Sequence, residues 1–407
     1  MTSSSTPSSE ATLPRGFTAA GTAVGIKKNG ARDLALIVSD RDCAAAALFT
    51  TNKVKAAPVL RGQAILSSRN AALRAVVINS GCANACTGAQ GLADAEETAR
   101  LAADAVRRLR GPADAISAAQ VFTMSTGVIG APLPMDKLRA GIALAAQQLS
   151  ADGLDNAARA IMTTDTRPKI ARIQRGAWSV TGIAKGAGMI HPNMATLLAC
   201  VFTDAEIEQS LLKEFLQRAA GVSFNRIVID GDTSTNDTLL ALANGASDLR
   251  IETPGQRAAF EQALTDVCVS LAQQIVRDGE GVTKFITLRI TGARDRRMAD
   301  AVGRSIARSP LVKTAFYGED ANWGRVVAAA GYSGEEVDPN RMTLWFGPVK
   351  VFEAGAPTDY DEAEATAAME PADIEVRLDL GSGDAEVTLW TCDLSHDYVT
   401  INGRYRT

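Results

Sequence analysis

The stretch KGAGMIHPNMATLLAC, residues 185–200, carries a single hydroxyl group, that of Thr196, beside an apolar run. A threonine hydroxyl attacks a carbonyl carbon once a base has removed its proton. A non-catalytic interpretation fits the same residues, because threonine suits β-strands and Gly, Pro and Asn are ordinary at a loop that enters one. Both interpretations stay open on this stretch alone.

Two further stretches contain groups that could take part in chemistry. In VFTMSTGVIGAPLP, residues 121–134, Ser125, Thr126 and Gly127 follow an apolar run. A hydroxyl beside a glycine amide suits an oxyanion hole, because glycine leaves the N–H exposed. On this stretch alone, an ordinary turn or helix cap is the favoured interpretation. Glu280 lies between two glycines in RDGEGVTKF, where a carboxylate is usually only a solvated charge.

Histidine is scarce, since the chain contains only His191 and His396. A Ser–His–Asp triad would have to use one of them, so we expect a site whose general base is another group. No metal site is expected, because Cys82 and Cys86 have no second Cys/His pair at a recognisable spacing. DGDTSTNDT, residues 230–238, lacks the glutamate of a calcium loop. We find no Walker loop or dinucleotide fingerprint, so no bound cofactor is expected.

Strand-like and helical patterns alternate over the first two thirds of the chain, which favours α/β layers. The strand-like runs are 33–40, 73–80, 178–184 and 226–231, and the helical patterns are 92–109, 135–149, 205–220 and 257–276. After about residue 284 the pattern is that of a smaller α+β domain. Its strand-like runs are 284–292, 342–347, 349–355, 374–381, 385–393 and DYVTING, 397–403. A helix is expected at about 299–310. GEDANWGR, 318–325, predicts a turn into a helix, with Trp323 as a packing anchor.

Composition narrows the function classes. The 407 residues have a net charge of −4 and no concentrated Lys/Arg run, which argues against a nucleic-acid partner. Residues 1–13 are polar and lack the features of a signal or transit peptide, so we expect a disordered tail. No stretch approaches the roughly 20 apolar residues of a membrane span, and the expected location is the cytoplasm.

Six long motifs follow one another along the chain: FTTNKVKAAPV (49–59), NSGCANACTG (79–88), STGVIG (125–130), KGAGMIHPNMATLLA (185–199), GDTSTNDT (231–238) and GEDANWGR (318–325). In this order they resemble the ornithine acetyltransferase (ArgJ) family of arginine biosynthesis. The resemblance runs from GFTAAG (16–21) to NGRYRT (402–407). It departs from the family pattern at His191, where a small residue is frequent, and at Cys82, where Asn is common.

The resemblance implies a self-processing α/β sandwich over 14–284 with a smaller C-terminal α+β domain over 285–407. It implies that the precursor cuts itself between Ala195 and Thr196 into an alpha chain (1–195) and a beta chain (196–407), which assemble as a heterotetramer of two copies each. Thr196 then becomes an N-terminal nucleophile. Its α-amine titrates near 7.7–8.0 and can be the base, which accounts for the scarcity of histidine.

The resemblance also implies the site residues. Thr126 and Gly127 would form the oxyanion hole, and the substrate would be bound by Thr163, Lys185, Thr196, Glu280, Asn402 and Thr407. Lys185 could meet a carboxylate and Glu280 an ammonium group.

The implied activity is acetyl transfer from N2-acetylornithine to glutamate through an acetyl-threonine intermediate. Many relatives also use acetyl-CoA to acetylate glutamate, and no residue here decides whether this chain does. Two alternatives remain: an N-terminal-nucleophile amidase or aminopeptidase on the same fold, and an unprocessed amino-acid-binding protein without turnover.

Overall fold

The computed structural model describes residues 12–67, 72–190 and 197–404. They fall into two compact units, and each unit is described by itself. The first unit comprises Met1–Gly186, Pro192–Asn225 and Thr233–Ile275, and the second comprises Ala187–His191, Arg226–Asp232 and Val276–Thr407. The chain therefore enters the second unit twice in short segments before it stays there.

The first unit is built on one mixed sheet, which has eight strands among the residues described. Its order is β4-β3-β2-β8-β7-β6-β5, and β1 pairs with β2 off this path. The β3/β4 and β7/β8 pairs are parallel and the others antiparallel. The bounds are β1 Phe17–Thr22, β2 Leu34–Phe49, β3 Ala72–Cys82, β4 Val121–Val128, β5 Lys169–Arg175, β6 Trp178–Lys185, β7 Leu198–Thr203 and β8 Thr238–Ala243.

Strands from the two halves of this sheet share one apolar layer. Ile37 of β2 belongs to one buried cluster with Phe202 of β7, and the rings of Phe17 and Phe202 lie 5.3 Å apart. Across the same layer, Cys200 Sγ of β7 lies 3.6 Å from Met124 Sδ of β4. Since side chains alternate along a strand, the residues between these face outward, where they meet helices.

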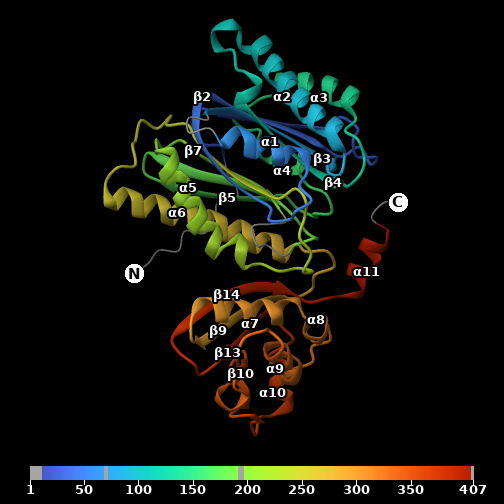
Figure 1. The fold of residues 1–407 in the computed structure, drawn as a ribbon, viewed down its shortest axis with the longest axis vertical. Helices are drawn as coiled ribbons and strands as arrows, with labels where there is room; N and C mark the ends of the chain where they lie inside the picture. The colour runs from blue at the N-terminus through green and yellow to red at the C-terminus, as the bar shows by residue number, and fades with distance from the viewer. Residues whose placement is uncertain (1–11, 68–71, 191–196, 405–407) are drawn as a thin grey trace. The chain divides into compact units, whose positions relative to one another are not determined.

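Helices cover the outer faces of the sheet. The cluster that contains Leu36 of β2 includes residues of α2 (Gly88–Arg110) and α3 (Met135–Gln147). Figure 1 shows α5 (Gln209–Val222) and α6 (Pro254–Arg277) on the other side of the first unit. There Trp178 of β6 packs on Phe260 of α6 at 5.5 Å. With α1 (Ala57–Leu66) and α4 (Leu154–Ala160), this arrangement is the predicted α/β sandwich, and that prediction is confirmed.

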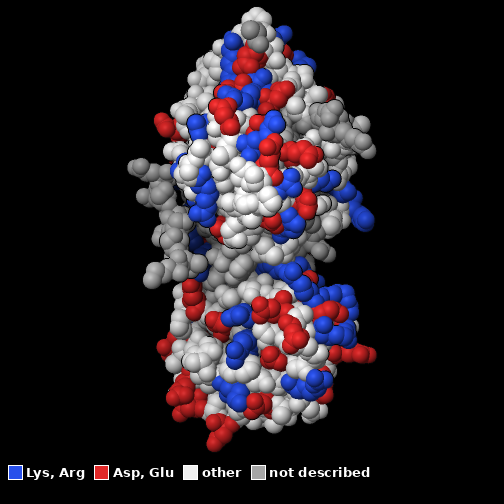
Figure 2. Space-filling view, turned by 90° about the vertical axis from the view of Figure 1, so that its left-hand side faces the viewer, with Lys and Arg blue, Asp and Glu red and all other residues white. Residues whose placement is uncertain are grey.

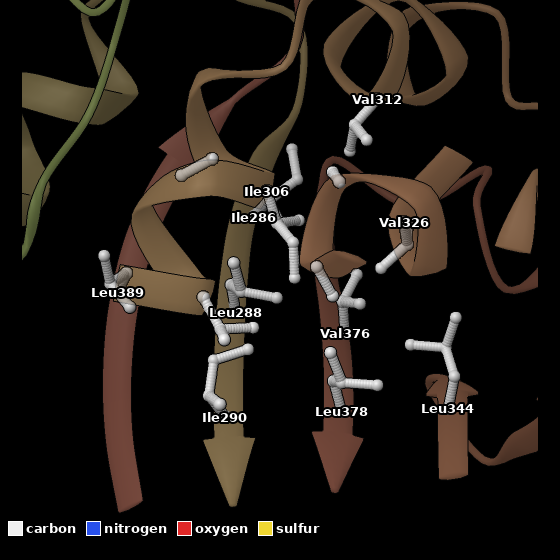
Figure 3. Close-up of a cluster of buried hydrophobic side chains, with 14 of the residues drawn as sticks. Ile286, Leu288, Ile290, Ile306, Val312, Val326, Leu344, Val376, Leu378 and Leu389 are labelled. Carbon is white, nitrogen blue, oxygen red and sulfur yellow. The ribbon is translucent and has the colours of Figure 1, made fainter. Parts of the chain in front are cut away.

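The second unit is a smaller α+β body, as predicted. Its sheet, six strands in the described part of the chain, has the order β12-β11-β10-β13-β9-β14. The bounds are β9 Phe285–Ala293, β10 Thr343–Phe346, β11 Val349–Glu353, β12 Ala356–Pro357, β13 Asp373–Asp379, β14 Ala385–Cys392, α7 Arg296–Arg308, α8 Pro310–Tyr317, α9 Trp323–Gly331, α10 Glu362–Ala367 and α11 His396–Gly403. Figure 3 shows part of its core, a buried cluster that includes Leu288 of β9, Leu389 of β14 and Ile306 of α7.

Two sequence-based assignments are wrong. DYVTING, predicted as a strand, lies in helix α11. RIVIDG, residues 226–231, does not form a strand, because Ile227 makes only an isolated bridge with Trp390. The prediction at GEDANWGR is confirmed: α9 begins at Trp323, and the Trp323 ring stacks on Phe352 at 5.2 Å.

Charged side chains of both signs are interspersed over each unit on the face drawn in Figure 2. Among the described residues, no helix has the length and apolar character needed to span a bilayer.

Candidate active site

Thr126 and Gly127 lie at the end of β4, where that strand pairs in parallel with β3. Gly127 has φ +131° and pairs with Gly81, and a Cβ atom added there would lie 2.3 Å from the carbonyl carbon of Gly81. Only glycine fits this backbone, because the clash would be with main-chain atoms that no rotamer change can move away. The strand end therefore brings two backbones unusually close and leaves Thr126 and Gly127 half-buried.

Lys185 reaches this strand end from β6. Its ammonium donates a hydrogen bond to the Thr126 hydroxyl, with Nζ and Oγ1 3.3 Å apart, and the residue is 8% exposed. A lysine ammonium only donates, whereas a hydroxyl can accept and donate at once. Thr126 therefore keeps its hydrogen for another acceptor, and the neighbouring positive charge makes that hydroxyl a better donor.

Asp165 connects the residues that were predicted to bind substrate in this unit, although the sequence did not single it out. One carboxylate oxygen, Oδ2, accepts from the backbone N–H of Thr163 at 2.8 Å and from its hydroxyl at 3.5 Å. The other, Oδ1, accepts from the Gly186 N–H at 2.7 Å and from Lys169 Nζ at 2.6 Å. Thr163 and the residue after Lys185 are thus held by one side chain.

Charge keeps Asp165 ionised in spite of its burial. Burial by itself would raise the pKa of Asp165, but the nearby Lys185 and Lys169 ammonium groups, together with hydrogen bonds, hold this pKa well below its usual range. The side chains of Asp165 and Lys169 are both fully buried. Burial also lowers the pKa of the nearby Lys27, while the charges of Asp33 and, less strongly, Asp165 oppose that change. The site is rich in lysine and has a firmly anionic centre.

Buried amides support the strand end from beneath. The Ser125 hydroxyl donates to Asn79 Oδ1 at 2.6 Å, and Asn79 Nδ2 donates to the Cys82 carbonyl at 2.8 Å. Asn236 Nδ2 donates both to the Ser125 carbonyl at 2.8 Å and to the Ala83 carbonyl at 2.6 Å. Because buried polar groups with partners fix local geometry, this network holds the β3 and β4 ends in place. Ser125 therefore has a structural part here.

In the second unit, Glu280 and Asn402 form a direct contact. Asn402 Nδ2, on α11, donates to Glu280 Oε2 at 2.6 Å. The Glu280 backbone N–H donates to the Ala187 carbonyl at 2.8 Å. Gly188 packs against the carboxylate, since a Cβ atom there would lie 2.4 Å from Oε2. Two residues 122 positions apart in the chain are thus brought into contact.

Glycine also allows α11 to approach the Glu280 loop. Gly281 has φ +69°, and an added Cβ atom would lie 2.6 Å from both Ser395 Oγ and the Tyr398 backbone nitrogen. Ser395 Oγ donates to the Gly281 carbonyl at 2.6 Å. The glycine that follows Glu280 therefore lets α11 begin directly against this loop.

The remaining predicted site residues lie outside the described part of the chain. These are Thr196, Ala195 and Thr407, and His191 lies there too. Of the two family departures, Cys82 is described: its buried thiol donates to the Ala131 carbonyl at 3.3 Å. No cluster of metal-binding side chains occurs among residues 12–67, 72–190 and 197–404.

The arrangement in the first unit has a definite chemical capacity. A hydroxyl donor beside a glycine backbone, with an ammonium group 3.3 Å from that hydroxyl, is suited to stabilising negative charge on an oxygen atom. Acyl transfer passes through such an oxyanion. In the second unit, a glutamate held by an asparagine offers a carboxylate that can bind a cationic amine.

Comparison with known proteins gives a consistent result over the full length. The family model described as "ArgJ family" matches residues 18–407. The arginine biosynthesis bifunctional protein ArgJ of Symbiobacterium thermophilum is 50% identical over 406 residues, covering 97% of this chain and 98% of that protein. The protein of the same name from Geobacter sulfurreducens is 47% identical over 400 residues, covering 97% and 99%.

A solved structure is also similar. It is an ornithine acetyltransferase from Mycobacterium tuberculosis complexed with ornithine, 45% identical, covering 47% of this chain and 98% of that one, with a TM-score of 0.43. The family model and the two relatives cover nearly all of the sequence that carries the motifs listed above. This chain therefore belongs to the ArgJ family.

Proposed function

We propose that this chain is a glutamate N-acetyltransferase of arginine biosynthesis. It cuts itself between Ala195 and Thr196 and then transfers acetyl from N2-acetylornithine to glutamate, yielding ornithine and N-acetylglutamate. Membership of the ArgJ family supports this proposal, since relatives of nearly equal length are named for arginine biosynthesis.

The observation that carries the proposal is the hydrogen bond from Lys185 to Thr126 beside Gly127. Acyl transfer needs donors placed where an oxyanion develops, and removing one such donor costs about 3 kcal/mol in other systems. The Thr126 hydroxyl is polarised by an ammonium group and is half-buried, so it can serve as that donor. Gly127, which cannot be replaced without a backbone clash, contributes the adjacent amide.

In the first half-reaction, the freed α-amine of Thr196 takes the proton of its own hydroxyl, and Oγ attacks the acetyl carbonyl carbon of N2-acetylornithine. The carbonyl oxygen becomes an oxyanion that Thr126 and Gly127 stabilise. The intermediate then expels the ornithine amine, which takes the proton back from the α-ammonium. The product of this half is an acetyl ester on Thr196.

In the second half-reaction, the amine of glutamate attacks the ester and releases the Thr196 hydroxyl, again with the α-amine carrying the proton. Acetyl transfer changes no oxidation state, so we propose that the enzyme needs no metal and no redox cofactor. Ornithine leaves before glutamate binds, which predicts ping-pong kinetics.

We propose substrate-binding roles for the residues that the family resemblance implies. Lys185 and Thr163 share the anionic centre Asp165, and Lys185 is suited to a substrate carboxylate or to the oxyanion. Glu280, held by Asn402, is suited to the side-chain ammonium of ornithine. Thr196 and Thr407 complete the proposed set by family resemblance.

We also propose that acetyl-CoA serves as a second acetyl donor. The relatives with 50% and 47% identity are both named bifunctional, and a Thr196 ester could be loaded from a thioester by the same attack. Appearance of N-acetylglutamate from acetyl-CoA and glutamate, without acetylornithine, would support this second activity. A rate equal to that of the Thr196→Ala variant would contradict it.

The first experiment measures self-cleavage. Intact mass spectrometry of the purified protein should show two chains, with the second beginning TLLACVF, and Thr196→Ala should stay full length. A fully active single chain would contradict the mechanism, and an uncut, inactive protein would favour a binding protein without turnover.

The second experiment measures partitioning of the acetyl group. With N2-acetylornithine and increasing glutamate, N-acetylglutamate should form at the expense of free acetate. Acetate as the dominant product at saturating glutamate would instead indicate an amidase.

The assembly and location remain part of the proposal. By family resemblance we propose two alpha chains (1–195) and two beta chains (196–407) in one particle, located in the cytoplasm. Native mass spectrometry should give one species with twice the mass of the precursor.

A further inference from the structure

The described chain just before the proposed cut, residues 187–190, is held by the second unit through its backbone. The Ala187 carbonyl accepts from the Glu280 N–H at 2.8 Å, and the Ile190 carbonyl accepts from the Ile229 N–H at 2.7 Å. The N–H groups of Met189 and Ile190 donate to the two carboxylate oxygens of Asp230, at 2.5 and 2.8 Å.

This backbone is strained at Met189. Its φ is +57°, in the left-handed region that a non-glycine residue seldom adopts. Two successive N–H groups that converge on one anion form the concave arrangement called a nest. Such a conformation persists only when its surroundings enforce it, and the Asp230 carboxylate supplies that enforcement. Met189 itself is 41% exposed, so its side chain is not what fixes the backbone.

The carboxylate is in turn tied to the C-terminal helix. The Tyr398 hydroxyl donates to Asp230 Oδ2 at 3.3 Å, and Asn402, one turn later, donates to Glu280. Asp230 lies in a mostly buried setting that raises its pKa, although the N–H groups of Asp232, Met189 and Ile190 oppose that change. Since α11 meets both Asp230 and Glu280, it braces both acidic groups that face residues 187–190.

We propose that Asp230 is a positioning residue for self-cleavage. It fixes the strained backbone of Met189 and Ile190, the last described residues before the proposed cut, and so sets the direction in which the chain leaves Ile190, while Tyr398 holds the carboxylate in place. Asp230 does not touch the reacting atoms in this proposal. The inference rests on the self-cleavage proposed above. It adds a function for Asp230, the first residue of the stretch DGDTSTNDT (230–238), which substrate binding does not use.

The experiment follows self-cleavage from the moment of synthesis. Cell-free translation of the full chain, sampled over time, gives the rate at which the precursor becomes two fragments on a denaturing gel. The variants are Asp230→Asn, which is nearly isosteric, and Tyr398→Phe. The matched control is Asp232→Asn, because Asp232 carries the same charge in the same loop and is exposed.

We expect Asp230→Asn to slow fragment formation at least roughly tenfold, which corresponds to about 1.4 kcal/mol in the barrier. Tyr398→Phe should slow it less, and Asp232→Asn should match the wild type. The decisive variant is the double substitution Asp230→Asn, Met189→Gly. Glycine adopts φ +57° without strain, so it should recover a large part of the lost rate, and no purely structural role for Asp230 predicts that recovery.

Two results would overturn the inference while leaving the proposed function intact. One is a wild-type rate of cleavage in Asp230→Asn. The other is a slow Asp230→Asn that Met189→Gly does not accelerate at all. A wild-type chain that never cleaves would instead refute the proposed function, so the two failures are distinguishable.

Discussion

Replacing Asp165 by Asn removes the anionic centre of the first unit while keeping its shape. Asp165 and Lys169 form a pair whose side chains are both fully buried, 2.6 Å apart. Removing one charge of a buried pair costs about 3–5 kcal/mol. For domains of 150–250 residues, 1 kcal/mol shifts the melting temperature by about 2–4 °C. We therefore expect Asp165→Asn to lower the melting temperature by about 6–20 °C.

The matched control is Asp155→Asn, which breaks a pair with Arg159 at 2.7 Å. Both of its side chains are about half exposed, and exposed pairs on a helix are worth only about 0.3–0.5 kcal/mol. Its melting temperature should therefore fall by at most about 2 °C. Thermal unfolding followed by circular dichroism measures both shifts. Equal shifts in the two variants would refute the argument from burial.

The Asp165→Asn substitution also tests whether Asp165 positions the substrate-binding residues. Asp165 holds the Thr163 and Gly186 backbones beside Lys185. Misplacing a substrate-binding group by about 1 Å can lower the rate about 100-fold. We therefore expect Asp165→Asn to reduce kcat/KM for N2-acetylornithine at least roughly tenfold. Initial rates at a temperature where both variants remain folded measure this effect. Unchanged kinetics in a folded Asp165→Asn enzyme would remove Asp165 from the site.

The contribution of Asp165 to the stability of the fold should depend on pH in a definite direction. Asp165 has a pKa below its usual value in the folded protein, so its ionisation stabilises the fold above the ordinary carboxyl pKa of about 3.9. That contribution disappears as the pH falls through the lower, folded value. The difference in melting temperature between the wild type and Asp165→Asn should be constant from about pH 8 to about pH 5. It should become smaller below about pH 4. A difference that widens in acid would contradict this assignment.

Three other predictions follow from the site. Thr126→Val should lower kcat by about 100- to 1,000-fold with little change in KM, as loss of an oxyanion donor does in other enzymes. Initial-rate plots should show the parallel lines of a ping-pong mechanism, and intersecting lines would argue against the acetyl-enzyme. Gly127→Ala should lower kcat with a measurable loss of stability, because its Cβ atom would lie 2.3 Å from Gly81 main-chain atoms; wild-type kcat would show that the strand end can shift freely. Deleting residues 402–407 removes the Asn402 contact to Glu280 but retains Tyr398, so the KM for N2-acetylornithine should rise strongly while self-cleavage continues, and unchanged kinetics would exclude Asn402 and Thr407.

Periodic segments could be predicted well from the sequence. The apolar spacing of 92–109 predicted a helix that the structure extends to Gly88–Arg110, and the strand-like run 284–292 corresponds to β9. These elements have one buried face, so the pattern of apolar side chains alone defines them.

The errors arose where tertiary contacts decide the structure. Tyr, Val, Thr and Ile in residues 397–403 favour strands, but Tyr398 and Asn402 lie one helical turn apart and bind Asp230 and Glu280 from the same side. Local preference is a weak guide against such contacts. Ile227, Val228 and Ile229 are apolar and buried, as in a strand, yet the only β-bridge of this segment among the described residues is the isolated one between Ile227 and Trp390.

Some of the residues that the structure brings into contact were named from the sequence. Thr126, Lys185, Glu280 and Asn402 were named from the family motifs, and the structure brings the first two and the last two into contact. Asp165 was missed because its partners are backbone N–H groups and buried lysines, which leave no residue pattern in the sequence. Thr196 and Thr407 lie outside the described residues, and the roles of all the named site residues stay predictions.

The order of strands in the first sheet has a consequence for how the mature protein is made. Within the first sheet, the proposed cut assigns β1–β6 to one product and β7 and β8 to the other. However, β8 pairs with β2, and β7 pairs with β6. The two strands of the second product are thus inserted between strands of the first. Separated from each other, one product would expose the edges of β2 and β6, and the other would expose the edges of β7 and β8. Open strand edges promote aggregation. Maturation must therefore run in one direction: the sheet closes in the intact precursor, the cut follows, and the two chains are interlocked from the moment they become separate molecules.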